Sequence, residues 1–241
     1  LRLTVDAYQV NIDDRIILTG QFGPNGNEEL QRLFDQAGAT RAAFFANAIS
    51  TQSRGIDIVL AHSIAFANGN ILRNDLAGTF SKTTWDQDKG INASDILEET
   101  GQVGTYFDQT SRIYLEQAVP RMKLSMGNTY LTDKFVFYLR NTFFGETTEA
   151  TNEPLFDADL NQIDTSIDPY NSAKILTDLS LGYIFSDNLR VTVGANNVLD
   201  VYPDEADPAF QSSGRFVYSR RSPQFSFGGR YLFARVAFTL N

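Results

Sequence analysis

The sequence predicts an all-β fold, a transmembrane antiparallel β-barrel, from three observations. Most of the chain alternates apolar and polar residues with a period of two, which is typical of strands with two different faces. Aromatic residues are abundant, with 19 Phe and 10 Tyr, although the mean hydropathy is only -0.23. Short turns also alternate with long connections. A membrane barrel accounts for all three, because its strands carry an apolar face within an alternating sequence and its long loops gather at one end.

The first three predicted strands cover residues 1–21, 42–66 and 71–84. The first two are the least regular, and the alternation slips near residues 8–10, where we expect a β-bulge. The segment Ala-Asn-Gly-Asn at 67–70 predicts a tight turn between the second and third strands, since Asn and Gly tolerate a positive φ.

The other five predicted strands alternate more regularly, and cover residues 118–131, 135–144, 174–185, 189–201 and 229–241. Their apolar faces carry Met122, Leu124 and Met126; Phe135, Phe137, Leu139 and Phe143; Ile175, Leu179, Leu181 and Tyr183; Leu189, Val191 and Val193; and Leu232, Ala234, Val236 and Phe238. Arg and Lys lie on the opposite faces. This arrangement favours a membrane strand, because a basic side chain facing lipid at the middle of the bilayer costs about 2–4 kcal/mol.

The connections between these strands alternate in length. Three are short turns, at 67–70, 132–134 and 186–188, and four are long, near 23–41, 85–117, 145–173 and 203–227. Outer-membrane barrels have short periplasmic turns and long extracellular loops, so we expect all four long loops on the outside. A soluble β-sandwich would instead need loops of similar length at both ends and polar outer faces.

Composition argues against several classes of site. The chain has no Cys, which excludes disulfides, thiolate nucleophiles and cysteine metal ligands, and its formal net charge of -9 argues against a nucleic-acid partner. His62 is the only His, so we interpret it as a strand residue near a barrel rim and expect neither a catalytic triad nor a zinc site. The segment 86–90 is similar to the start of a calcium loop, but lacks its spacing and its closing Glu, which favours a solvated acidic loop. We expect no resident metal or cofactor.

Several motifs occur in the order typical of one family. They are Asp6–Ile16; Phe44–Ala48, continuing to Arg54–Asp57; Val119–Arg121; Arg140–Gly145; the Asn-x-x-Asp-x-Tyr-Pro strand end within Gly194–Pro203; and the closing strand from Gly228 to Phe238. Because they spread over nearly the whole chain, the sequence resembles the C-terminal part of the barrel of a TonB-dependent outer-membrane receptor. The final residues, Thr239 to Asn241, depart from the aromatic residue with which the family typically ends.

The resemblance implies a barrel of about 22 strands around an N-terminal plug, of which residues 1–241 form a C-terminal segment of about eight strands. It implies a place in the bacterial outer membrane and TonB-coupled uptake of a scarce nutrient, without enzymatic activity. The implied partners are outer-membrane lipid, the TonB complex through an N-terminal part with its TonB box, and a small-molecule or oligosaccharide ligand. Ferric siderophores, haem, cobalamin and oligosaccharides all stay open. The alternative is a self-contained eight-stranded barrel with a structural or adhesion role; we favour the segment because Leu1 begins in the middle of an alternating pattern.

The long loops contain the candidate ligand contacts. We select six residues: Trp85, Tyr106, Arg215, Tyr218, Arg220 and Arg221. Arg and aromatic side chains recognise carboxylates, catecholates or sugar faces, but they also suit a barrel rim that anchors in the membrane interface. The loop between Gly145 and Ala173 has seven carboxylates and no Lys or Arg, which would attract cations. Ordinary solubility of a surface loop explains that charge equally well.

Overall fold

The computed structural model describes residues 1–150, 155–156, 162–163, 170–206, 211, 216–219 and 223–240. Its main element is an eight-stranded antiparallel sheet in the order β1-β2-β3-β4-β5-β10-β11-β12. The strands are β1 (Arg2–Leu18), β2 (Phe45–Ala65), β3 (Ile71–Trp85), β4 (Met122–Leu131), β5 (Phe135–Phe144), β10 (Lys174–Ser186), β11 (Leu189–Asn196) and β12 (Tyr231–Phe238). All eight predicted strands are therefore confirmed.

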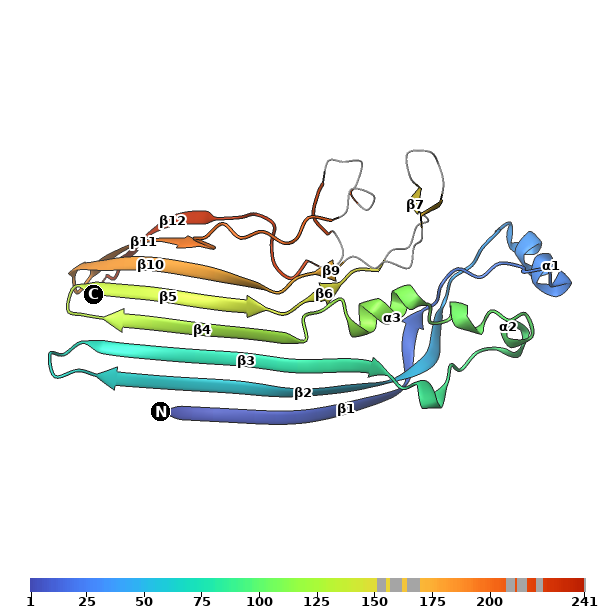
Figure 1. The fold of residues 1–241 in the computed structure, drawn as a ribbon, viewed down its shortest axis with the longest axis horizontal. Helices are drawn as coiled ribbons and strands as arrows, with labels where there is room; N and C mark the ends of the chain where they lie inside the picture. Colours follow the sequence, from blue (N-terminus) through green and yellow to red (C-terminus); the bar gives the residue numbers. More distant parts are fainter. Residues whose placement is uncertain are drawn as a thin grey trace.

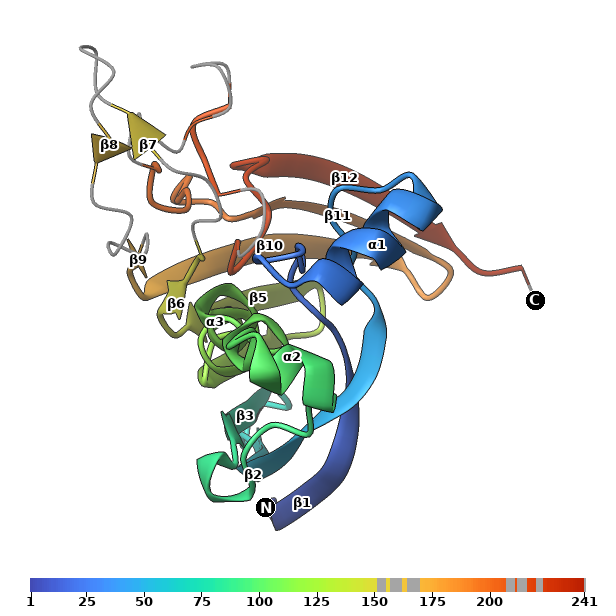
Figure 2. The same ribbon diagram turned by 90° about the vertical axis from the view of Figure 1, so that its right-hand side faces the viewer.

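The sheet curves into an open arc, which Figure 2 shows end-on. Each strand pairs with the strand of this sheet that comes before or after it along the chain, so the strands run up and down like those in the wall of a barrel. The strands β1 and β12 form the two edges of the arc, and no pairing joins them among the described residues. The chain is thus part of a barrel wall, and not a closed barrel.

The pairing register assigns each side chain to one face of the sheet, because residues directly opposite on neighbouring antiparallel strands point to the same side. One row runs from Leu60 through Leu76 to Met126, and continues in the same register into β5. We call the face that carries these residues the apolar face. The opposite, charged face carries Arg2, Asp6, Asp57, Arg73, Asp75, Lys123, Arg140, Lys174, Asp178, Arg190 and Arg235. The predicted separation of apolar and charged faces is present in all eight strands, with Arg54 on β2 and Lys82 on β3 as exceptions on the apolar face.

The connections are sorted by length between the two ends of the sheet (Figure 1). The three short turns, β2 to β3, β4 to β5 and β10 to β11, lie at the same end as both chain termini, and the long connections lie at the other end. In the first turn Gly69 has a φ of 85°, a value that glycine adopts without strain. This sorting agrees with the prediction.

The bulge in β1 lies further along the strand than predicted. Pairing is continuous from Arg2 to Ile12, and the register shifts only between Ile12 and Ile16, where Asp14 has a φ of 50°. The pattern changes at Tyr8 for another reason. Tyr8 lies opposite Gly55, and a Cβ on that glycine would be only 2.3 Å from the Tyr8 ring. The large ring over a glycine, and not an extra residue, interrupts the apolar alternation there.

The long connections contain short helices that the sequence did not predict. The first contains α1 (Glu28–Ala37); the next contains η1 (Gln87–Lys89), α2 (Asp95–Glu99), η2 (Val103–Thr105) and α3 (Gln109–Glu116). The third contains two small strand pairs, β6 (Thr147–Thr148) with β9 (Tyr170–Asn171) and β7 (Leu155–Phe156) with β8 (Gln162–Ile163). No helix in the described part of the chain is long and apolar enough to cross a membrane.

In the buried core found among the described residues, the first two long connections pack against the first residues of β2. Its members are Phe22, Leu30, Phe34, Ala48, Ile49, Leu97, Tyr106 and Phe107. The helix α1 contributes through its apolar side; Asn27 caps its start by accepting a hydrogen bond from the Leu30 backbone N–H, and Gly38 ends it at a φ of 61°. These loops therefore pack as one small unit at the long-loop end of the sheet.

Candidate functional site at the long-loop end

The turn after β11 is closed by the side chain of Asn197. Its Nδ2 donates to the carbonyl of Val201 over 2.7 Å, and its Oδ1 accepts from the backbone N–H of Val201 over 3.0 Å. On β10, Asp178 accepts a hydrogen bond from the backbone N–H of Asn197 over 2.9 Å. Because Asn197 has a φ of 50°, an Asn suits this position better than most side chains do. The Asn-x-x-Asp-x-Tyr-Pro motif of the sequence thus begins with a turn that directs the chain away from the sheet.

The same turn holds the approach to β12. Asp200, with a φ of 57°, accepts from the backbone N–H of Arg230 over 2.8 Å. The ring of Tyr202 lies against Gly229, where a Cβ would be 2.2 Å from the Tyr202 hydroxyl oxygen. The negative charge of Asp200 raises the pKa of Tyr202, so the phenol stays protonated. These contacts fix the position of the Tyr202 ring at the long-loop end of the sheet.

Tyr202 belongs to a stack of aromatic rings, which we call the ring stack: Tyr202, Phe216, Tyr218 and Phe227. The rings of Tyr202 and Tyr218 lie 5.9 Å apart at 8°, and those of Tyr218 and Phe227 lie 6.4 Å apart at 14°. Phe216 meets Phe227 edge-on at 4.8 Å. Tyr202 and Phe227 are 39% and 46% exposed, so part of the surface of both residues is open to solvent and can be reached by a ligand. The predicted contact Tyr218 lies in this stack, whereas the sequence did not single out Tyr202 as a contact.

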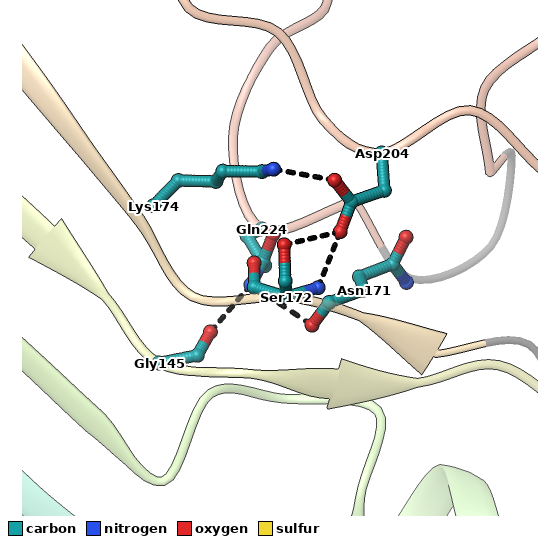
Figure 3. Close-up of polar contacts among 6 residues, drawn as sticks. All are labelled: Gly145, Asn171, Ser172, Lys174, Asp204 and Gln224. Carbon is teal, nitrogen blue, oxygen red and sulfur yellow. Dashed lines mark hydrogen bonds and ion pairs between the residues drawn. The ribbon is translucent and has the colours of Figure 1, made fainter.

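A polar network joins the connection between β5 and β10 to the connection between β11 and β12 (Figure 3). Asp204 accepts from the backbone N–H and the hydroxyl of Ser172, both over 2.5 Å, and forms an ion pair with Lys174 at the start of β10. Desolvation raises the pKa of the Asp204 carboxyl, but the hydrogen bonds from Lys174 and Ser172 outweigh it and leave the pKa below its ordinary value. Asp204 is therefore ionised at neutral pH.

Gln224 joins the same network from the far side of the last loop. Its Nε2 donates to the carbonyl of Gly145 over 2.5 Å and to that of Ser172 over 2.9 Å. The side chain is buried, which makes these bonds costly to break. Through Gln224 and Asp204 the loop after β11 is fastened to the end of β5 and the start of β10. Sequence reasoning did not identify either residue, because their partners are far away in the chain.

The predicted contacts Trp85 and Tyr106 lie in the packed loop unit. Tyr106 is only 3% exposed, and its hydroxyl bonds to the Ser94 backbone N–H over 2.9 Å, so in this structure it supports the loops from inside. Trp85 is half-buried between the Phe107 ring at 5.4 Å and the Arg112 guanidinium at 5.8 Å. Neither residue reaches the ring stack by any contact found among the described residues. Their role in contacting a ligand stays a prediction.

The remaining predicted contacts and most of the acidic loop fall outside the described residues. These are Arg215, Arg220 and Arg221, and, in the acidic loop, Glu153, Asp157, Asp159, Asp164 and Asp168. The segment that is similar to a calcium loop forms η1, where Lys89 pairs with Asp13 over 2.5 Å. Within the described part of the chain, no group of three or more His, Asp or Glu residues is placed to hold a metal ion.

Comparison with known proteins gives the same fold. The outer-membrane transporter YddB from Escherichia coli has a TM-score of 0.56 at 13% identity, over 98% of this chain and 30% of that one. The copper transporter OprC has a TM-score of 0.54 at 12% identity, over 98% and 28%. The ferric-catecholate import receptor Fiu from E. coli K12 has a TM-score of 0.52 at 12% identity, over 98% and 25%. No curated protein matches the chain.

A family description, the β-barrel of TonB-dependent receptor-like proteins, matches residues 1–198. The chain therefore belongs to the TonB-dependent receptor β-barrel family, whose members are receptors and transporters, and its location is the bacterial outer membrane. It spans less than a third of the length of the solved structures described above. From the general architecture of such barrels we expect the apolar face of the sheet to face lipid, the charged face to line the lumen, and the long loops to lie outside the cell.

Proposed function

We propose that this chain forms the C-terminal part of the wall, and part of the outer mouth, of a receptor that takes up a scarce nutrient with energy supplied through TonB. The observation that carries the proposal is the exposed ring stack, held at the extracellular end of a membrane sheet by Asn197 and Asp204. Rings at a barrel rim can also anchor in the membrane interface, but mutual stacking of several rings on one loop favours a binding surface. Membership of the family supports uptake as the purpose of that mouth.

The nutrient that fits best is a chelate with flat apolar or aromatic parts. Parallel rings such as Tyr202 and Tyr218 attract planar groups by stacking, which contributes about 0.5–1.5 kcal/mol per aromatic contact. Among the proteins of similar fold, Fiu is a ferric-catecholate import receptor, and another is the ferripyoverdine receptor of the outer membrane of Pseudomonas aeruginosa. We therefore place a ferric siderophore first. An oligosaccharide is the second candidate, since sugar faces also pack on aromatic rings.

Growth on defined nutrients tests this function. A strain lacking the gene is supplied with single sources of iron, ferric siderophores or haem, or with cobalamin or oligosaccharides, with and without a working TonB. We expect a growth defect on a ferric siderophore that the intact gene restores only when TonB is present. Restoration that does not depend on TonB, or an unchanged phenotype on every source, would overturn the proposal. Recovery of the unmodified siderophore inside the cell would support transport without catalysis.

We also propose that these residues are one segment of a wider barrel, with a plug and a TonB-contacting part elsewhere in the protein. The open edges β1 and β12 support this, because unpaired backbone groups in lipid cost several kcal/mol each and need further strands as partners. The intact mass of the protein purified from outer membranes is the test. We expect a mass well above the 26.9 kDa of these residues; a mature protein of that mass would support the self-contained barrel instead.

A further inference from the structure

Two cations interrupt the otherwise uncharged apolar face of the sheet. Along the continuous register, which in β1 ends at Ile12, Arg54 and Lys82 are the only charged side chains that the eight strands place on this face. They are directly opposite each other on β2 and β3. Both side chains are exposed, and neither forms an ion pair with any described residue. A chain with a net charge of -9 thus places two like charges together on its lipid-facing surface.

The position of this pair matches the outer boundary of the lipid core. The last apolar pair of the two strands is Ile56 opposite Phe80, and Arg54 and Lys82 follow directly on the extracellular side. Membrane barrels have an apolar band about 25 Å tall, beyond which the lipid headgroups begin. The two cations therefore mark the extracellular limit of the apolar rows on β2 and β3, which is where such a band meets the headgroups.

The surroundings of the pair are polar and suit a headgroup. Gln9 extends the row of Arg54 and Lys82 onto β1, and the next row outward consists of Asn11, Gln52 and Thr84. Arg54, Gln52 and Thr84 also line a hollow of about 420 Å³, whose loop side carries the carboxylates of Asp86 and Asp88. Cations can bind a phosphate at the membrane side of this hollow, and carboxylates can accept hydrogen bonds from sugar hydroxyls further out.

Electrostatics also calls for an anion at this place. Like charges directly opposite on neighbouring strands, with Cβ atoms about 4.5–5.5 Å apart, destabilise a sheet unless something compensates them. A phosphate between the guanidinium and the ammonium would accept charge-assisted hydrogen bonds from both. We propose that Arg54 and Lys82 form a binding site for the phosphate of a phosphorylated glycolipid in the outer leaflet, with the polar residues around them contacting its headgroup.

The test compares lipid binding by the purified protein and two double variants. The probes are phosphatidylcholine bilayers that contain lipid A, and matched bilayers in which the lipid A has lost its phosphates. Arg54→Gln with Lys82→Gln removes the proposed site, and Arg190→Gln with Arg235→Gln removes the same charge from the lumenal face. Each cation near an anionic membrane surface contributes about 1 kcal/mol, or roughly fivefold in affinity, so the first pair should weaken lipid A binding more than tenfold.

We expect the lumenal variant to bind lipid A like the unaltered protein, and the dephosphorylated lipid to bind the unaltered protein as weakly as the first variant binds lipid A. Equal binding of the two lipids, or unchanged binding by the first variant, would overturn the site. Displacement of lipid A by inorganic phosphate alone would also overturn it, in favour of a site for the free anion. A melting curve of each variant confirms that it is folded before binding is measured.

Discussion

The side chain of Asn197 makes two hydrogen bonds to the backbone of Val201, donating to its carbonyl and accepting from its N–H. The backbone N–H of Asn197 donates to the carboxylate of Asp178 on the neighbouring strand β10. One asparagine thereby ends β11, starts the loop that carries Tyr202, and joins both to β10.

Replacing Asn197 with Ala should destabilise the end of β11 by about 1–3 kcal/mol, because two backbone groups of Val201 lose their hydrogen-bond partners. In addition, Ala tolerates the positive φ at this position less well than Asn does. Asn197→Gly is the matched variant, since it relieves the backbone and still lacks both hydrogen bonds. Hydrogen exchange at residues 197–206 measures the effect. We expect faster exchange in both variants; protection equal to the unaltered protein in Asn197→Gly would show that the hydrogen bonds contribute nothing.

Acid should loosen the network around Asp204. Because its pKa is lowered in the folded protein, its contribution to stability is fully present above the ordinary carboxyl value of about 3.9 and is lost as the pH falls through the lowered value. Proteolysis of the loop after β11, followed from neutral pH downward, should stay constant to about pH 4 and then rise. Asp204→Asn should raise cleavage at neutral pH and remove the acid transition. An unchanged transition in that variant would assign it to another group.

Removing rings from the stack should weaken ligand binding. Tyr202→Ala and Tyr218→Ala should each reduce affinity for the transported ligand roughly fivefold, the equivalent of about 1 kcal/mol for one aromatic contact. Phe185→Ala is the control, because this exposed ring lies at the short-turn end of the sheet. Uptake of the labelled ligand by whole cells gives the comparison. A defect in the control as large as in the stack variants would argue for a general loss of folding.

A charge should be tolerated on one face only. Val193→Arg places a cation on the apolar face and should cost about 2–4 kcal/mol near the middle of the bilayer, with a lower yield in the outer membrane. Thr192→Arg places the same charge on the lumenal face of the same strand, directly opposite Arg235, where repulsion between the like charges should cost at most about 1 kcal/mol, so its yield should fall less than that of Val193→Arg. Similar yields of the two variants would contradict the assignment of faces.

The strands could be predicted from the sequence because their signal is local. Alternation in segments such as 189–196 directly reflects which side chains meet lipid, and Asn and Gly mark the turns between them. The loop helices could not be predicted in the same way. Helix α1 has ten residues, too few to be stable alone, and depends on packing of Leu30 and Phe34 against Phe22 and Leu97 from other segments.

The candidate site was predictable only in part, for a related reason. Tyr218 could be selected because an aromatic residue among arginines is visible in the sequence. Its stacking on Tyr202 joins two separate parts of the connection between β11 and β12, and the hydrogen bond from Gln224 to Gly145 joins residues 79 positions apart. The burial of Tyr106 likewise arises from two loops packing together. Such contacts depend on how the loops pack against one another in three dimensions, which composition and local sequence pattern do not show.

Site-directed spin labelling tests the central claim, that the eight strands form a membrane wall with lipid on the apolar face. These 241 residues contain no cysteine, so single labels can be placed at Leu181, Val193 and Val236, and at Ser180, Thr192 and Arg235. In bilayers, the first three labels should be relaxed mainly by oxygen, which concentrates in lipid, and the second three mainly by a polar nickel chelate. Equal access of the nickel chelate to both sets would contradict the account.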